Sequence, residues 1–116
     1  MSNDIYCDEI LNGQLPVKKV IETERVLAFH HTRPSFEAHI VVIPKKHIPS
    51  LIELDEQDKD ILTELLCVVQ KVATQVNAEY GACGVETYMG EYQSSKHLHV
   101  HVRAGKQLRP TGALVK

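Results

Sequence analysis

The feature that most constrains the fold is the stretch 97–102, HLHVHV, in which histidine alternates with an aliphatic residue. Successive side chains of a β-strand point to opposite faces of a sheet. A strand here would carry His97, His99 and His101 on one face, repeating about every 7 Å. Its aliphatic face would pack against a hydrophobic core. We therefore expect a rigid row of imidazoles on a buried sheet.

Imidazole suits three kinds of chemistry near neutral pH, because it acts as a nucleophile, a general acid or a metal ligand. The alternative interpretation is a cluster of half-buried surface histidines without a chemical role. Histidine is a minor residue of protein interiors, so three in line favour the chemical interpretation.

The whole chain gives weaker constraints. Its 116 residues predict a single domain, 1–116, and its formal net charge of -2 argues against a nucleic-acid partner. The polar, acidic N-terminus and the absence of long apolar runs predict no membrane partner and a cytoplasmic location. Three widely spaced cysteines, Cys7, Cys67 and Cys83, do not form a disulfide framework.

The pattern of apolar residues predicts an α+β domain with an antiparallel, meander-like sheet and one long helix packed on it. The long helix is expected over 55–80, with Asp55 as its N-cap and Gly81 after its end. A short helix is expected over 4–11, closed by Gly13. Strands are expected at 17–21, 26–31, 38–43, 85–89 and 97–104. Dimerisation would cover the exposed edges of such a sheet.

Four segments carry a resemblance to a known family: 26–30 (VLAFH), 42–48 (VIPKKHI), 93–94 (QS) and the stretch 97–102. The chain resembles the histidine triad (HIT) proteins, specifically the Hint-like branch of nucleoside phosphoramidases, over about residues 4–105. The resemblance implies a five-stranded antiparallel sheet with one long and one short helix. It also implies a homodimer with a ten-stranded sheet.

The resemblance implies a nucleotide-binding hydrolase that cleaves purine nucleoside 5′-phosphoramidates, or related nucleoside monophosphate derivatives, at the α-phosphorus. His99 would be the nucleophile and form a covalent nucleotidyl-histidine, while His101 would protonate or orient the leaving group. His97 would line the site, and His47 would complete the histidine cluster. No cofactor is required for this chemistry.

The nucleotide-binding residues implied by the resemblance come from two parts of the chain. Ser94 and nearby backbone amides would hold phosphate oxygens, and Gln93 would fix their loop. The full expected set is Phe29, His30, His31, Gln93, Ser94, His99 and His101.

Three residues differ from the family pattern. These differences do not change the expected reaction type, but they leave the substrate preference open. His31 stands where Hint-like proteins carry an aspartate that binds the ribose hydroxyls; it is either a different ribose contact or only a loop residue. Glu86 replaces an asparagine, and an acidic group near a phosphate would repel it unless it points away. Arg103 replaces an apolar residue on the histidine face. Adenine and guanine are not distinguished.

A structural zinc ion is a separate expectation from the resemblance. Many bacterial relatives carry Cys-x-x-Cys near the N-terminus, and here the pattern is Asp4 to Cys7. Asp4, Cys7, His47 and His97 would form a four-ligand site. The alternative is an ordinary half-buried Cys7.

Three other functions remain open from the sequence. The first is a metalloenzyme whose alternating histidines chelate a catalytic metal. The second is a nucleotide-binding module with little turnover. The third is a dinucleoside polyphosphate hydrolase or nucleotidyltransferase of the wider HIT family.

Overall fold

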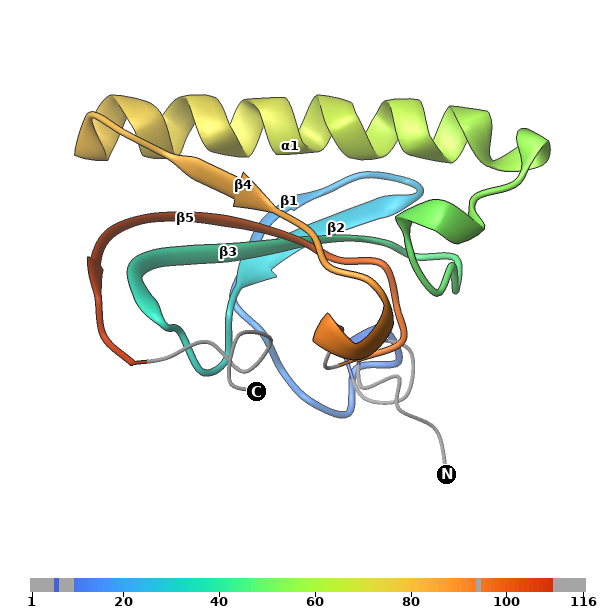
Figure 1. Cartoon of the computed structure of the whole chain (residues 1–116), viewed down its shortest axis with the longest axis horizontal. Coiled ribbons are helices and arrows are strands. Elements are labelled where there is room, and N and C mark those ends of the chain that lie inside the picture. Colours follow the sequence, from blue (N-terminus) through green and yellow to red (C-terminus); the bar gives the residue numbers. More distant parts are fainter. Residues whose placement is uncertain (1–5, 7–9, 94, 110–116) are drawn as a thin grey trace.

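A computed structural model describes residues 6, 10–93 and 95–109 of the chain. Five strands form one antiparallel sheet in the order β1-β2-β3-β5-β4. The strands are β1 (Lys19–Glu22), β2 (Val26–His30), β3 (Phe36–Pro44), β4 (Gly84–Glu86) and β5 (Val100–Gln107). The expected fold class, an antiparallel sheet with one long helix, is confirmed (Figure 1).

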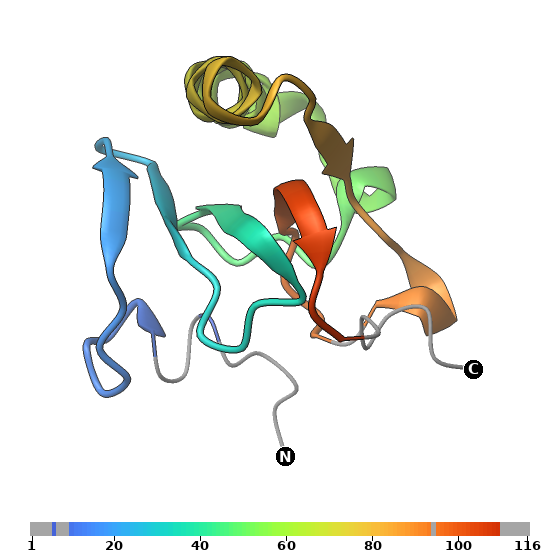
Figure 2. The same cartoon turned by 90° about the vertical axis from the view of Figure 1, so that its left-hand side faces the viewer.

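The long helix α1 (Lys59–Tyr80) crosses one face of the sheet, as the end-on view makes clear (Figure 2). It packs Leu65, Val68, Val69, Val72 and Val76 against alternate residues of β2, β3 and β5. The other alternate residues of β2 and β3 include members of a second core cluster on the opposite face, to which Tyr6 and Ile10 also belong. The sheet therefore buries apolar side chains on both faces, and residue parity decides the face on which a side chain lies.

The start of the helix differs from the expected helix over 55–80. A 3₁₀ turn, η3 (Glu56–Asp58), comes first, and α-helical geometry begins at Lys59. The N–H of Asp55 donates to Oδ2 of Asp58 at 3.0 Å, which satisfies a backbone donor at the turn. Gly81 ends the helix with a φ of 76°, as expected. Within the described residues, no helix is both long enough and apolar enough to span a membrane.

The last strand begins at Val100 and not at His97, so the predicted start is wrong. Val100 pairs with Val42 on β3, and two residues further along β3 stands Pro44, which has no N–H to continue the ladder. The carbonyl of Pro44 accepts a hydrogen bond from Nε2 of His97 (2.8 Å), and the N–H of Leu98 donates to the carbonyl of Ile48 (2.6 Å). The alternation of faces nevertheless continues back to Leu98, which is buried on the α1 side.

Two other predicted elements differ or lie partly outside the description. β4 is shorter than the expected strand 85–89, because Thr87 instead bonds its hydroxyl to the carbonyl of His99 (2.8 Å) and a 3₁₀ turn, η4 (Gly90–Tyr92), follows. The expected helix over 4–11 falls largely outside the described residues. Gly13, its expected stop, has a φ of 84°.

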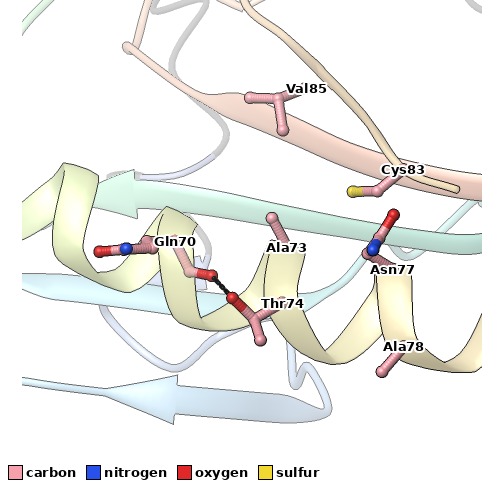
Figure 3. A pocket seen from close by; sticks show the side chains of 7 residues that line it. All are labelled: Gln70, Ala73, Thr74, Asn77, Ala78, Cys83 and Val85. Atoms are coloured by element: carbon pink, nitrogen blue, oxygen red, sulfur yellow. Dashed lines mark hydrogen bonds between the residues drawn. The ribbon is translucent and has the colours of Figure 1, made fainter.

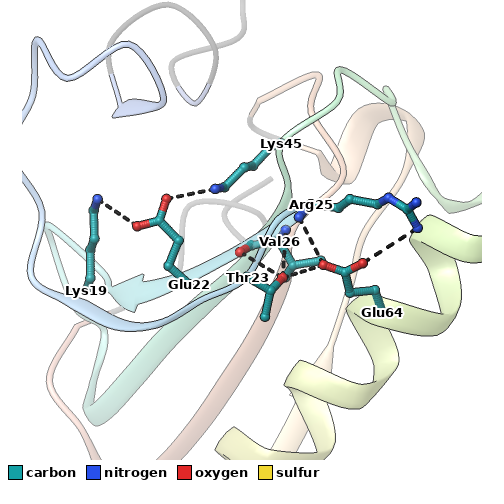
Figure 4. Close-up of polar contacts among 7 residues, drawn as sticks. All are labelled: Lys19, Glu22, Thr23, Arg25, Val26, Lys45 and Glu64. Carbon is teal, nitrogen blue, oxygen red and sulfur yellow. Dashed lines mark hydrogen bonds and ion pairs between the residues drawn. The ribbon is translucent and has the colours of Figure 1, made fainter.

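The turn between β1 and β2 is attached to α1 by one carboxylate (Figure 4). Oε2 of Glu64 accepts the hydroxyl of Thr23 (2.5 Å) and the backbone N–H of Arg25 (2.9 Å). Beside it, Glu22 bridges Lys19 and Lys45. These hydrogen bonds connect the turn between β1 and β2 to the helix that covers the sheet.

Candidate functional site

Four imidazoles gather on the face of the sheet opposite α1. His39 of β3 and His101 of β5 lie 5.1 Å apart between ring centroids, and His31, just after β2, lies 4.4 Å from His39. The ring of His99 lies 4.9 Å from that of His101 between centroids, in a T-shaped arrangement. His99 and His101, both expected in the site, are thus neighbours in the structure.

His39 is the functional candidate that sequence reasoning missed. It occupies the same face as Val41 and Ile43, and Val41 pairs directly with His101. The strand was predicted from the run of aliphatic residues 40–43, and parity along that strand puts His39 on the face opposite Ile40 and Val42. What the sequence did not contain was the register that brings β3 and β5 together.

The hydrogen bond of His99 defines which ring nitrogen carries its proton. Nδ1 of His99 lies 2.6 Å from the carbonyl oxygen of His97. A carbonyl only accepts, so Nδ1 donates and the neutral ring keeps its lone pair on Nε2. The side chain is 3% exposed and its ring lies 5.0 Å from that of Tyr6. His99 is therefore a buried imidazole with a fixed tautomer.

A second chain of hydrogen bonds fixes the tautomers of His39 and His101. The backbone N–H of Ser35 donates to Nδ1 of His39 at 3.0 Å, so the proton of neutral His39 is on Nε2. That Nε2 donates to Nδ1 of His101 at 2.9 Å. The proton of neutral His101 must then be on its Nε2, which makes this atom a donor.

The electrostatics of the cluster keep these rings neutral at pH 7. Desolvation by burial lowers the pKa of His101 to about 3, and repulsion from His99, His39 and His31 adds to it. Burial, with repulsion from His31, lowers the pKa of His39 to about 4. Both values lie well below neutrality, so the tautomer assignments hold in neutral solution.

His31 is part of this cluster and not merely a loop residue. Its backbone N–H donates to the carbonyl of His39 (2.8 Å), and its Nδ1 accepts the backbone N–H of Arg33 (2.9 Å). Burial is the main cause that lowers its pKa, followed by the charges of His99, Arg109 and Arg33.

The other two expected histidines, His47 and His97, form a separate pair. Their rings lie 5.5 Å apart, edge to face. His97 is fully buried, and its Nε2 donates to the carbonyl of Pro44. The expected zinc ligands Asp4 and Cys7, and the expected phosphate-binding Ser94, lie outside the described residues.

The remaining nucleotide-binding candidates lie around the cluster. Phe29 is 1% exposed within the second core cluster, whereas His30 has an exposed side chain. The side-chain amide of Gln93 donates to the carbonyl of Pro49, so it ties the loop before the histidines to the loop after β3.

Glu86 does not present an isolated negative charge to the site. Its carboxylate accepts hydrogen bonds from Nε of Arg103 and from the hydroxyl of Tyr88 (2.7 Å). Burial opposes ionisation of Glu86, but these two bonds hold its pKa below the ordinary value. Burial and Glu86 together raise the pKa of Tyr88 to about 12. Arg103 also lies over the ring of Phe36, with its Cζ 4.3 Å from the centroid.

A groove of about 480 Å³ lies elsewhere, between α1 and the segment that enters β4 (Figure 3). Its lining includes Ala73, Asn77, Cys83 and Val85. It contains no histidine or carboxylate, so the imidazole cluster and not this groove is the candidate active site.

The chain is similar to a protein family and to several known proteins. The family described as "Scavenger mRNA decapping enzyme C-term binding" matches residues 3–112. An uncharacterised HIT-like protein of Azospirillum brasilense is 35% identical over 111 residues, covering 93% of this chain and 90% of the relative.

Two solved structures extend the comparison. A HIT family hydrolase from Clostridium thermocellum is 30% identical with a TM-score of 0.79, covering 97% of this chain and 98% of its own. A hypothetical histidine triad nucleotide-binding protein from Sulfolobus tokodaii is 32% identical with a TM-score of 0.77, covering 86% of this chain and 67% of its own.

Proposed function

The chain belongs to the histidine triad (HIT) family, and from this premise we propose that it is a nucleotide-binding hydrolase acting on purine nucleoside 5′-phosphoramidates or related nucleoside monophosphate derivatives. The observation that carries the proposal is the Nδ1–H bond of His99 to the carbonyl of His97. In the neutral form of this buried imidazole it directs the lone pair to Nε2, which needs no separate base to act as a nucleophile. The names of the Clostridium and Sulfolobus relatives support the hydrolase and nucleotide-binding parts.

The proposed reaction has two displacements at the α-phosphorus. Nε2 of His99 attacks phosphorus, and the bond from phosphorus to the leaving amine breaks as that amine takes up a proton from solvent. Water then attacks the phosphorus of the nucleotidyl-histidine and gives up one proton to solvent, the bond from phosphorus to Nε2 breaks with its electron pair returning to Nε2, and the nucleoside monophosphate leaves. Both steps use the same fixed imidazole, so the protein needs no metal-bound nucleophile.

His101 is proposed to orient the leaving group by hydrogen bonding. The low pKa of His101, about 3, means that the unliganded protein holds this ring neutral, with Nε2–H as a donor. A donor of this kind binds an oxygen or nitrogen acceptor without first being an imidazolium ion. His39 is proposed as the positioning residue that keeps His101 in this tautomer through the bond between them.

Binding of the phosphate oxygens is proposed for the loop before β5. Ser94 and the adjacent backbone amides would donate to them, and Gln93 would hold that loop through its bond to Pro49. His97 would serve the reaction through its carbonyl, which orients His99.

A structural zinc ion held by Asp4, Cys7, His47 and His97 is a further proposal. His97 fits this role, because its Nε2–H donates to a backbone carbonyl and a neutral ring then carries its lone pair on Nδ1. Metal-bound histidines commonly have this arrangement. The ion would brace the loop after β3 against the segment before β5 and would take no part in catalysis.

A homodimer is proposed on the strength of the sheet edge. β4 is a three-residue edge strand, Val85 on it is 50% exposed, and the groove beside it is lined by α1. A second copy would cover this edge and the adjacent groove.

The proposal is tested by hydrolysis of adenosine and guanosine 5′-phosphoramidates. We expect turnover in the native protein and a loss of roughly a thousandfold or more in His99→Ala, as removal of a nucleophile commonly gives. Chelation should leave turnover intact, and if zinc is bound it should lower only the melting temperature. The exposed substitution Lys71→Gln, on α1, serves as the control.

Two results would contradict the proposal. Turnover that disappears on chelation and returns with added metal would indicate a metalloenzyme. A folded protein that binds nucleoside monophosphates but turns over neither phosphoramidate would indicate a binding module.

A further inference from the structure

The three histidines His31, His39 and His101 lie close enough together to be considered as a metal site. Each offers a nitrogen, and these atoms lie within 4.8 Å of one another. Imidazole nitrogens bind Zn²⁺ readily when their lone pairs face the ion. The hydrogen bonds around the rings decide whether they do.

Those bonds fix the wrong tautomers for chelation. Nδ1 of His31 accepts the N–H of Arg33, and Nδ1 of His39 accepts the N–H of Ser35. Each neutral ring therefore carries its proton on Nε2, where a metal would need a lone pair. A histidine that binds metal through Nε2 donates Nδ1–H to an acceptor, and here both Nδ1 atoms face donors. The cluster presents N–H groups.

The Nε2–H of His31 is the donor that the proposed reaction does not use. Among the residues that the structure describes, no hydrogen-bond acceptor lies against it. Its ring is held in place by its contact with His39 and by the backbone bonds on both sides. A half-buried, oriented donor of this kind is available to an acceptor atom of a ligand that displaces water from it.

Two cations belong to the segments around His31 and act on it electrostatically. Arg33 follows His31 closely in sequence, and Arg109 bonds its Nε to the carbonyl of Pro34 at 3.0 Å, which places its guanidinium on the same loop. Burial first, and then the charges that include Arg109 and Arg33, lower the pKa of His31. The nearby carboxylate of Glu86 is already paired with Arg103, so the surroundings of His31 favour an anion.

We propose that His31, Arg33 and Arg109 bind a second anionic group of the substrate. The preferred ligands are then nucleoside 5′-monophosphate derivatives that carry another phosphate or carboxylate, on the ribose or on the leaving group. This inference rests on the proposed function for the position of the first phosphate, beside His99. An aspartate at position 31 would instead accept hydrogen bonds and repel such a group.

The test compares the affinities of AMP, ADP and adenosine 3′,5′-bisphosphate by calorimetry, in the absence of added metal. We expect ADP or the bisphosphate to bind about tenfold more tightly than AMP, the size of one charge-assisted hydrogen bond in a partly exposed site. A gain for ADP assigns the second anion to the leaving-group side, and a gain for the bisphosphate assigns it to the ribose. Added salt should reduce the gain.

Four variants separate this inference from general electrostatics. His31→Asp should abolish the gain, whereas His31→Gln, which keeps a donor, should retain part of it. Arg109→Gln, an exposed change that does not endanger folding, should reduce the gain about threefold or more. Lys71→Gln removes the same charge from α1 and should leave the gain unchanged.

Equal affinities for the three nucleotides, in a protein that hydrolyses phosphoramidates, would overturn this inference and leave the proposed function standing. Failure to bind AMP together with absence of turnover would overturn both. Zinc binding that is lost in His31→Gln and in His39→Gln would also overturn the inference, because it would show lone pairs where the tautomers place protons.

Discussion

At the scale of single residues, the site is defined by which ring nitrogen carries each proton. Four backbone groups set these positions: the carbonyls of His97 and Pro44 accept, and the N–H groups of Arg33 and Ser35 donate. The first two leave lone pairs for a nucleophile or a metal, and the last two leave N–H donors. Similar histidines a few ångströms apart thus acquire opposite chemical roles.

The burial of neutral histidines makes folding stability depend on pH. The pKa of His39 is about 4 in the folded protein against an ordinary 6.5, so the unfolded chain binds a proton that the folded chain does not. The stability from this group is complete above pH 6.5 and is lost as the pH falls toward 4. We expect urea unfolding to show a loss on the order of 2 kcal/mol from this histidine over that interval.

The variant His39→Gln should show a smaller loss over the same interval, and the exposed His30→Gln should behave as the native protein does. The pKa values of His101 and His31 are also lowered, so these rings lose stability over the same interval, and the effect of His39 is the difference between the native protein and the variant. An unchanged loss in His39→Gln would contradict the account of a buried neutral ring.

At the scale of elements, the alternation in 97–102 predicted the faces correctly, and the periodicity of α1 predicted its buried stripe. The start of β5 was not predictable from its own residues, because it depends on Pro44 in the partner strand. His39 was missed for the same reason, since its contact with His101 exists only in the register of β3 and β5. Local patterns determine faces, whereas pairing determines neighbours.

Two adjacent leucines of α1 test the packing of helix on sheet. Leu65 is 2% exposed and Leu66 is 55% exposed. Leu65→Ala should lower the free energy of unfolding by about 2–5 kcal/mol, because it leaves a cavity in the core. Leu66→Ala makes the same chemical change on the helix surface and should shift it by less than about 0.5 kcal/mol. If the two variants lost the same free energy of unfolding in chemical denaturation, the assignment of Leu65 to the buried face of α1 and of Leu66 to the exposed face would be contradicted.

At the scale of the whole molecule, the two faces of the sheet differ in what they carry. One face is covered by α1, and the other carries the imidazole cluster beside a second apolar cluster. The fold class could be predicted from the sequence, because the apolar pattern of a helix and the apolar patterns of strands occur in clearly separate segments. The sequence was insufficient for the extent of β4 and for the groove beside it, which arise from contacts between distant segments.

The proposed dimer gives a prediction at this scale. Val85→Glu places a charge at the middle of β4 and should convert a dimer to a monomer, because a buried unpaired carboxylate is costly at an interface. Light scattering coupled to size exclusion measures the mass directly. Leu51→Glu, at an exposed position on the 3₁₀ turn η2 (Leu51–Glu53), should leave the mass unchanged. A native protein that is already monomeric would contradict the dimer.

Trapping of the covalent intermediate tests whether His99 is the nucleophile. The protein is mixed with a phosphoramidate, quenched during turnover under alkaline conditions and digested for mass spectrometry. We expect a peptide that contains His99 and carries the added mass of a nucleotidyl group, and we expect no such peptide from His99→Ala. Multiple turnover with no adduct at any quench time, or an adduct on a residue other than His99, would contradict this role of His99.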